Sequence, residues 1–509
     1  MSYIPWIVIA VYIIVVTAIG IFIGYRKKAA RDMESYFNAD KSLSSWAVAL
    51  SVTGMAISGV VYVGVPGNCY ANGWTPYLAA ALLGSFPGIL GTNLLSGRPI
   101  RIVSEKLGSY SVTDLCAKMF KERRLSYPSV PAMVIFSIAM LMVQWVTIGN
   151  LFTVFLEGVD YTTCMILGVV MVSIYCVIGG NNSNSYVCIA QMLIAVVVSV
   201  SLGVFAIHLD GGFVKLNYDL ARINPEYVQF GTAGYPMSAA VSVFLMYFLG
   251  YIGNPGSVSK YFGIKDKRSG AKCALIQTVS MLLIQFVIFG GLCYRIMAER
   301  GVVPFCDNTD TVFPSFVKYF TNPWVSGIVM AAALAAIMST ASTIMITTSS
   351  TMVQDILGEM LHKDISGAKG VRYSRISMII VILLSAVAAI KPNSDILSMG
   401  SATFGCFAAV FTPTVFFGLR WRRATKQGAL ASMWCGLIFI VVTKAASILF
   451  GFVWPTKQLF FNDTVWGIFL SIAVFVIVSL ATPYQEKDYL PPTRKELKTM
   501  KYSPDAYTA

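Results

Sequence analysis

Apolar residues run along this chain in long, nearly unbroken stretches that short polar segments separate. A helix needs about 20 consecutive apolar residues to cross a bilayer. With 56% hydrophobic and 12% charged residues among 509, the composition excludes a water-soluble globule. We therefore predict an all-α polytopic membrane protein embedded in the lipid bilayer. The thirteen predicted spans lie at residues 4–25, 45–66, 76–97, 131–156, 161–179, 185–207, 237–258, 273–298, 323–352, 376–390, 396–419, 427–450 and 464–482.

The basic residues are concentrated on one predicted side of the membrane. Loops rich in Lys and Arg stay in the cytoplasm, so we predict an outside N-terminus and a cytoplasmic C-terminus in a plasma (inner) membrane protein. The net charge of +14 then belongs to loops near anionic lipid, and no basic domain or aromatic platform suggests a nucleic-acid partner. Thirty of the 38 Lys and Arg residues lie in segments 26–41, 98–124, 260–272, 363–375, 420–426 and 487–501.

The ninth predicted span carries many hydroxyl groups and no charge. Residues 334–350 read L-A-A-I-M-S-T-A-S-T-I-M-I-T-T-S-S, and hydroxyls gain nothing by facing lipid. Ser339 and Thr340 follow Ala336 by three and four residues, on one helical face. If a local kink frees the Ala336 carbonyl, these oxygens form half of a neutral cage for a hard monovalent cation. The alternative is that the hydroxyls are small packing residues between helices.

Glycine and proline interrupt two of the predicted spans. Residues 51–67 read S-V-T-G-M-A-I-S-G-V-V-Y-V-G-V-P-G, and residues 247–256 read Y-F-L-G-Y-I-G-N-P-G. These spans open two successive blocks of five, so we expect inverted repeats at about 45–207 and 237–419. Unwound backbone at membrane depth is tolerated only where it lines a cavity. The paired interruptions therefore predict a substrate site at mid-membrane.

Polar side chains beside these interruptions are the candidate substrate contacts. Thr53 and Ser58 flank the first interruption, and Tyr247 and Tyr251 lie one turn apart just before the second. A pair of tyrosines offers apolar rings with hydroxyl tips, which suits a small polar organic molecule. The alternative is that they are interfacial anchors, the commoner role of tyrosine in membrane proteins.

The residues that intramembrane proton transfer or catalysis would need are missing. No Asp or Glu lies near the middle of a predicted span, which disfavours a proton relay. The only histidines, His208 and His362, fall in predicted loops, and the ten cysteines form no C-x-x-C pair. We therefore expect no enzyme activity and no organic cofactor.

Four separated segments resemble the solute:sodium symporter family over residues 1–485. They are F-N-A-D-K-S-L-S-S-W-A-V-A-L-S from Phe37, G-V-P-G-N-C-Y-A-N-G-W from Gly64, L-A-A-I-M-S-T from Leu334 with S-S-T-M-V-Q-D-I after it, and G-L-R-W-R-R-A-T-K-Q-G-A-L-A-S-M from Gly418. The resemblance implies one transporter domain with a LeuT-like 5+5 inverted-repeat bundle, one extra helix before it and two after it. Residues 486–509 would form a cytoplasmic tail.

The resemblance also implies a sodium site between the first and eighth core helices. Its ligands would be the backbone carbonyls of Gly54, Ile57 and Ala336 and the side chains of Ser339 and Thr340. This set agrees with the oxygen cage inferred from the hydroxyl-rich span.

Two positions depart from the family pattern. Ala56 and Cys188 stand where several members have an aspartate implicated in ion binding. With neutral groups at both positions, we expect one bound sodium ion for each solute. The sequence G-N-P-G-S-V-S-K-Y-F-G-I-K-D from Gly253 is nearest in pattern to the proline and pantothenate branch, which favours a small carboxylate-bearing solute.

The combined interpretation is a secondary active symporter that imports a small organic solute with sodium by alternating access. Its partners are the solute, the sodium ion and the bilayer, and we expect a monomeric functional unit. Two alternatives stay open from the sequence: a proton-coupled or uncoupled carrier of the same fold, and a transporter-like membrane sensor.

The predicted topology can be tested with cysteines placed one at a time in a cysteine-free background. Labels applied from outside should reach position 457 and not position 267, because Lys267 lies in a positively charged loop that stays in the cytoplasm. Labelling of both positions from the same side would contradict the thirteen-span topology.

Overall fold

The computed structural model describes residues 3–26, 45–109, 111–262, 270–392, 394–455 and 459–483. These residues form helices and turns, with no strand among them. Lys267, Lys457, the predicted tail at 486–509 and most of the basic segment at 26–41 lie outside the described residues.

Ten of the described helices are long and apolar enough to span a membrane. The other three predicted spans correspond to α1 (Ile4–Arg26), to a broken helix at the second position, and to the first part of a longer helix, α10. The ten spans are Thr75–Leu107, Arg123–Thr153, Val187–Leu209, Met237–Phe262, Lys272–Glu299, Pro323–Met360, Lys369–Ala389, Ile396–Arg420, Lys426–Phe450 and Asp463–Ala481.

The fifth and sixth predicted spans belong to a single helical element, α10 (Tyr161–Leu209). The prediction of a loop between these spans, at residues 180–184, is therefore wrong, because the backbone remains helical there.

Both ends of α10 nevertheless lie at the same face of the molecule. A straight helix of this length would extend about 73 Å. At one end Asp210 pairs with Arg300 at 2.7 Å, and at the other Tyr161 lines a cavity together with Asn308. Eight residues reach at most about 29 Å, so α10 doubles back and the chain crosses the bundle twice, as two spans require.

The second span is interrupted at Ile57 and Ser58. Helix α3 (Ser45–Ala56) ends there, and the chain resumes in the π-helical η2 (Val60–Gly64) and then α4 (Val65–Asn72). The Ser58 hydroxyl accepts the Val60 N–H at 3.2 Å, and the side-chain oxygen of Gln144, on another helix, accepts the Gly59 N–H at 3.1 Å. Side-chain oxygens thus replace the helical carbonyls that the break removes.

The seventh span is interrupted at Asn254. Helix α12 (Met237–Gly253) ends before it and α13 (Pro255–Phe262) begins after it. The Asn254 side-chain oxygen accepts the Gly256 N–H at 2.8 Å and the Ser257 N–H at 3.4 Å. Asparagine as the cap followed by proline at the first helical position is a standard helix start, so the sequence itself restarts the helix here.

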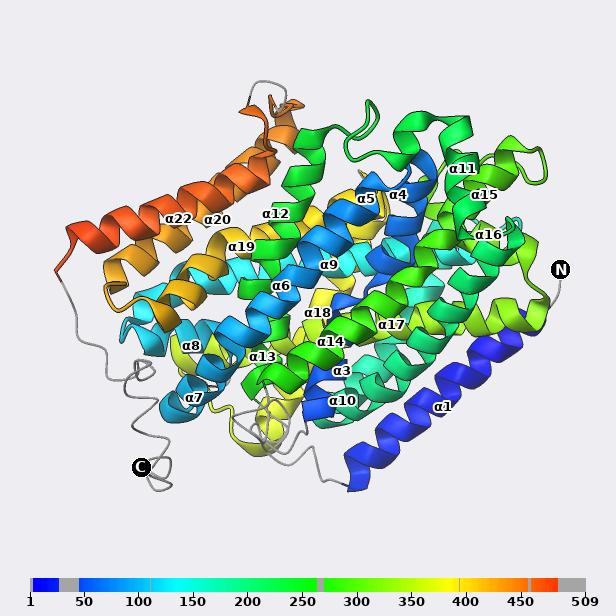
Figure 1. Cartoon of the computed structure of the whole chain (residues 1–509). Coiled ribbons are helices and arrows are strands. Elements are labelled where there is room, and N and C mark those ends of the chain that lie inside the picture. The colour runs from blue at the N-terminus through cyan, green and yellow to red at the C-terminus, as the bar shows by residue number, and fades with distance from the viewer. Residues whose placement is uncertain are drawn as a thin grey trace.

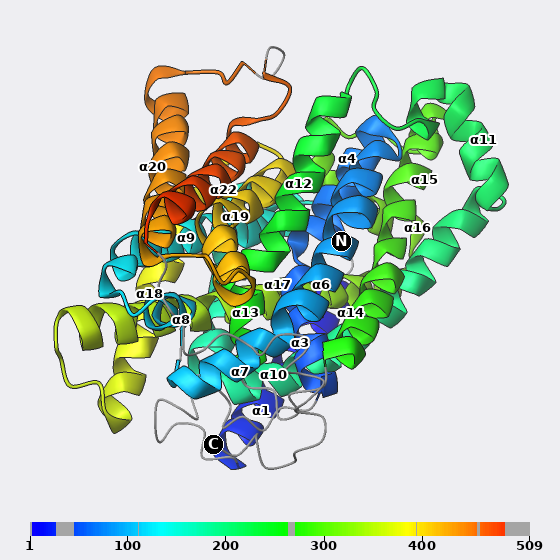
Figure 2. The ribbon, with the colours of Figure 1, turned by 60° about the vertical axis from the view of Figure 1, so that its left-hand side comes forward.

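Helix α17 (Pro323–Ser350), which continues as the π-helical η9 (Thr351–Met360), occupies the centre of the bundle (Figure 1). Nearly all of its apolar stretch is buried, because α1, α3, α9 (Ser126–Thr153) and α10 pack around it. Helices α20 (Lys426–Phe450) and α22 (Asp463–Ala481) lie at the other side of the bundle from α1 (Figures 1 and 2).

The remaining elements complete the spans and connections. They are α5 (Thr75–Tyr77), η3 (Leu78–Ser85), α6 (Phe86–Gly91), η4 (Thr92–Gly97), α7 (Arg98–Leu107), α8 (Val112–Met119), η5 (Arg123–Leu125), α11 (Phe213–Ile223), η6 (Pro225–Val228), α14 (Gly270–Ile284), η7 (Gln285–Val287), α15 (Ile288–Glu299), η8 (Thr309–Thr311), α16 (Val312–Phe320), α18 (Gly367–Ala389) and α19 (Ile396–Arg420).

Gly253, at the end of α12, allows α12 and α19 to approach closely. A Cβ at this position would lie 2.3 Å from the Thr412 hydroxyl oxygen and 2.5 Å from the Thr412 backbone nitrogen. The same hydroxyl donates to the Leu249 carbonyl at 2.8 Å. The second interruption is therefore held against α19 by contacts that only glycine permits.

Replacing Gly253 by alanine should lower the free energy of unfolding by about 1–3 kcal/mol, because backbone atoms must move to admit the methyl group. The matched control is Gly91→Ala, whose Cβ would meet only Ile252 at 3.8 Å. Thermal denaturation in detergent should show a lower Tm for Gly253→Ala alone, and equal Tm values would contradict the close approach.

Candidate functional site

Helix α17 places Ser339 and Thr340 against the end of α3. The Thr340 hydroxyl oxygen lies 3.1 Å from the Gly54 carbonyl oxygen and 3.5 Å from that of Ile57. It also lies 3.1 Å from the Ala336 carbonyl oxygen of its own helix. A Cβ on Gly54 would meet the Ser339 hydroxyl at 2.2 Å. The structure therefore brings together all five residues proposed as sodium ligands.

These oxygens cannot satisfy one another. The Thr340 hydroxyl has one proton to donate, yet at least three carbonyl oxygens lie within 3.5 Å of its oxygen. Thr340 and Ser339 are fully buried. Lone pairs that converge on one point in a low-dielectric interior favour a hard cation. That these residues bind sodium stays a prediction.

Helix α17 reaches this site without a kink. The sequence suggested that a kink frees the Ala336 carbonyl, but α17 is one continuous helix from Pro323 to Ser350. That suggestion is wrong. A carbonyl oxygen has two lone pairs, so the Ala336 oxygen accepts from the Thr340 hydroxyl without leaving the helix.

The other hydroxyls of α17 face protein, as the sequence predicts. Ser342 and Thr343 donate to the Ser339 carbonyl at 3.1 and 3.0 Å. Thr348 donates to Ile344 at 2.7 Å, whereas Ser349 donates to Ser374 of α18 at 3.0 Å. The packing interpretation therefore describes these residues, and the cage interpretation describes Ser339 and Thr340.

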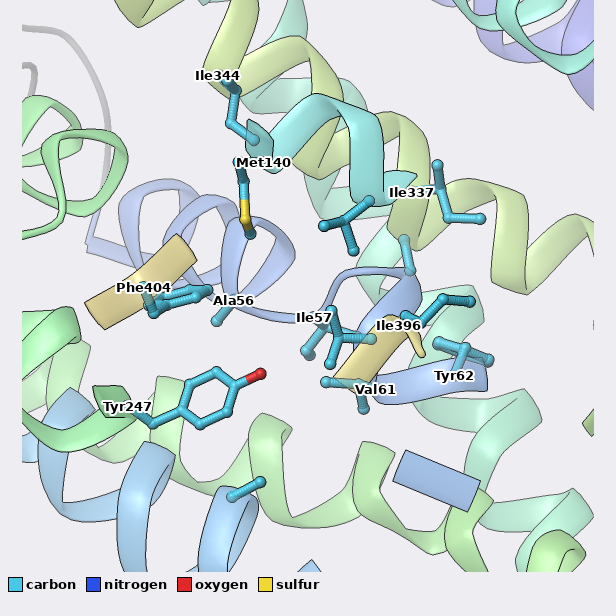
Figure 3. Packing of buried hydrophobic residues seen from close by; sticks show 14 of the residues in the cluster. Ala56, Ile57, Val61, Tyr62, Met140, Tyr247, Ile337, Ile344, Ile396 and Phe404 are labelled. Carbon is cyan, nitrogen blue, oxygen red and sulfur yellow. The ribbon is translucent and has the colours of Figure 1, made fainter. Parts of the chain in front are cut away.

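Three of the four candidate substrate residues line one cavity. Ser58, Tyr247 and Tyr251 border a narrow cavity of about 10 Å³ beside the first interruption. The two tyrosine rings stack with centroids 6.3 Å apart, and the Phe404 ring packs against both. Figure 3 shows the Tyr247 hydroxyl pointing toward Ala56 and Ile57. Thr53 is not among the residues that line this cavity; its hydroxyl donates to the Ala49 carbonyl at 2.9 Å.

The sequence reasoning missed Gln285 as a residue of this cavity. Gln285 lines it from η7, the 3₁₀ turn between α14 and α15. Its side-chain oxygen is buried and accepts no hydrogen bond among the described residues. A single glutamine within the apolar run from 281 to 289 was the available signal, because a buried amide needs partners.

Ala56 and Cys188, the two positions at which the sequence departs from the expected family pattern, adjoin these sites. Ala56 lines the cavity, and the Cys188 thiol lies 3.4 Å from the Ser339 hydroxyl. Both groups are neutral in ordinary conditions. A cation at the predicted sodium site would therefore meet uncharged oxygens alone.

The model of the Sodium:solute symporter family matches residues 36–436, most of the chain. The chain belongs to this family. It is 26% identical over 490 residues to the osmoregulated proline transporter OpuE of Bacillus subtilis, covering 93% of this chain and 94% of that protein. It is 24% identical over 471 residues to the sodium/pantothenate symporter of Escherichia coli K12, covering 92% and 94% respectively.

A solved structure of similar fold is a Na⁺-coupled sialic acid symporter in a substrate-bound, outward-open state. It shares 18% sequence identity, and the TM-score is 0.77 over 96% of this chain and 99% of that one. The LeuT-like fold expected from the resemblance is thus confirmed. Together with the family membership, this makes the chain a multi-pass, sodium-coupled solute symporter with sodium as the co-transported ion.

Ser339→Ala and Thr340→Ala should each raise the sodium concentration for half-maximal uptake by about tenfold or more, because each removes one of about five oxygen ligands. Uptake in proteoliposomes over a sodium titration measures this. Thr348→Ala is the control, since its hydroxyl serves only α17 in the described contacts. Unchanged sodium dependence in both variants would remove the sodium assignment.

Proposed function

We propose that this symporter imports a small carboxylate-bearing organic solute, such as an amino acid or pantothenate, with one sodium ion per solute. The observation that carries the proposal is the adjacency of two features at the first helix break. The oxygens around Thr340 meet the carbonyls of Gly54 and Ile57, and the cavity of Ser58 and Tyr247 lies beside the same break.

This adjacency gives a physical route for coupling. Sodium links the end of α3 to α17 by binding the Gly54 and Ile57 carbonyls together with the α17 oxygens. A solute in the cavity links the same break to α12 by contacting Tyr247. Each ligand stabilises the arrangement of the break that the other one needs, so the two binding free energies are coupled. Release of both ligands frees the broken helices to move relative to the surrounding bundle, which is alternating access.

The cavity lining favours a solute that combines a carboxylate with apolar surface. Six of its residues are aliphatic: Ala56, Val60, Val61, Val65, Ala80 and Ala81. A sugar, with a hydroxyl on nearly every carbon, would leave many polar groups unpaired against such walls. The start of the second half-helix at Val60 presents the positive end of a helix dipole at the same cavity, which favours a carboxylate.

The solutes of the relatives agree with this chemistry. The relatives named above carry proline and pantothenate by name, and both of these molecules have a single carboxylate. For this chain such a solute is an inference from the cavity and the similarity together.

We further propose the organisation expected from the sequence: one transporter domain over 1–485 with repeats at about 45–207 and 237–419, the N-terminus outside, and a single chain as the transport unit. Gly234, just before α12, lies against Asn72 at the end of α4. The two broken helices thus run in opposite directions through the bundle, which supports inverted repeats.

A thermal-shift panel of the purified full-length chain tests the solute. Proline, other amino acids, pantothenate, monocarboxylates, sialic acid and sugars are compared in sodium and in choline. We expect one carboxylate class to raise the Tm in sodium only, because a ligand stabilises the state it binds. In Thr340→Ala the same solute should give a smaller shift. Stabilisation by sugars alone, or an equal shift in choline, would contradict the proposal.

A further inference from the structure

Beyond the sodium site, α17 continues as a row of hydroxyls that ends at a carboxylate. Thr343, Thr347 and Thr351 follow Thr340 at successive helical turns, and Asp355 comes one turn later. The rise of the helix places Asp355 about 20 Å from Thr340 along the axis. The predicted ninth span ended at 352, but η9 continues to Met360, so this carboxylate belongs to the helix.

A second cavity accompanies this row. It is a narrow space of about 20 Å³ between α17, α8 and α13. Thr343 donates its proton to the Ser339 carbonyl, and Thr347 donates to Thr343 or Ile344. A hydroxyl that donates to its own helix presents lone pairs to its surroundings, which suits a cation better than an anion. The lining includes Thr343, Thr347, Ser350 and Thr351 from α17 and η9, Ser111 and Val112 of the α8 region, and Lys260 of α13.

Behind Ser111, which lines this cavity, lies a buried carboxylate that lacks a full set of partners. Asp355 is 1% exposed. One of its oxygens accepts hydrogen bonds from Ser111 at 3.0 Å and from Thr113, and the other accepts none among the described residues. The Thr351 hydroxyl oxygen lies 3.4 Å from the Thr113 hydroxyl oxygen. One carboxylate and three hydroxyls thus gather where the cavity meets α8.

The charges around Asp355 favour a cation there. The neighbouring charges that act on it, those of Asp114 and Glu359, are acidic, although Asp114 is itself paired with Lys118 at 2.8 Å. A buried carboxylate without a counter-charge is costly. The π-helical geometry of η9 is frequent at functional sites.

We propose that sodium leaves the Thr340 site along this hydroxyl-lined face of α17 and binds a second time at Asp355, with Ser111, Thr113 and Thr351 as the other ligands. The inference rests on sodium coupling and not on the identity of the solute. The ion at Asp355 has already left the first site, so coupling stays at one sodium ion per solute.

Equilibrium binding of radioactive sodium to the full-length chain in nanodiscs, without solute, tests this second site. We expect two bound sodium ions in the natural protein, one in Asp355→Asn, which keeps the shape but not the charge, and one in Thr340→Ala. The matched control is Asp364→Asn, a carboxylate in the loop after η9 that pairs with Lys369 at 2.7 Å and should leave both ions in place.

A second pair of variants covers the case that Asp355→Asn fails to fold. Thr351→Val and Ser111→Ala each remove one neutral ligand and should weaken one of the two sodium affinities by about tenfold. Two ions bound to Asp355→Asn, or natural affinities in both Thr351→Val and Ser111→Ala, would overturn the proposal. The proposal would also be overturned if the natural protein bound one sodium ion and the Thr340→Ala variant bound none.

Discussion

Backbone carbonyls and amides without helical partners are costly in hydrocarbon, and the arrangement of this symporter follows from how it meets that constraint at Ile57 and Ser58. The amides after the break are met by the Ser58 hydroxyl and by Gln144 of α9. The carbonyls before the break converge on Thr340 of α17. An N–H group after the break thus bonds to α9, and the carbonyls before it bond to α17. A shift of the chain at this break changes both sets of contacts.

The burial of α17 is a consequence of the same constraint. A helix whose hydroxyls donate to another helix's backbone carbonyls must be shielded from lipid, because exposed hydroxyls are costly in hydrocarbon. Helices α1, α3, α9 and α10 provide that shield. Their contacts explain why so polar a helix lies at the centre of the bundle.

The sequence predicted the features that depend on chemistry within one helix. The Gly and Pro residues identified both interruptions, and the spacing of Ala336, Ser339 and Thr340 placed their oxygens together. It was less informative where the outcome depends on packing between distant segments. Thr53 was an equally good candidate as Ser58 by position, yet only the fold decides which hydroxyl lines the cavity.

Other misses have a common physical cause. The role of Gln285 depends on α14 and α15 lying beside the first break, and the role of Asp355 depends on α8 reaching η9, neither of which hydropathy reveals. Hydropathy also ends a span where polar residues begin, so it stopped the ninth span before Asp355. The kink at Ala336 was a wrong inference because a second lone pair on the carbonyl made it unnecessary.

The neutral groups at Ala56 and Cys188 also determine how the membrane potential acts on transport. With no carboxylate at either position, the charge carried by the loaded sites is that of the cargo alone. One sodium ion with a monoanion forms a neutral complex, and its uptake follows the two concentration gradients. One sodium ion with a zwitterion carries a positive charge, to which 100 mV contributes about 2.3 kcal/mol. At the proposed ratio of one sodium ion per solute, uptake would be electroneutral for pantothenate-like solutes and electrogenic for amino acids.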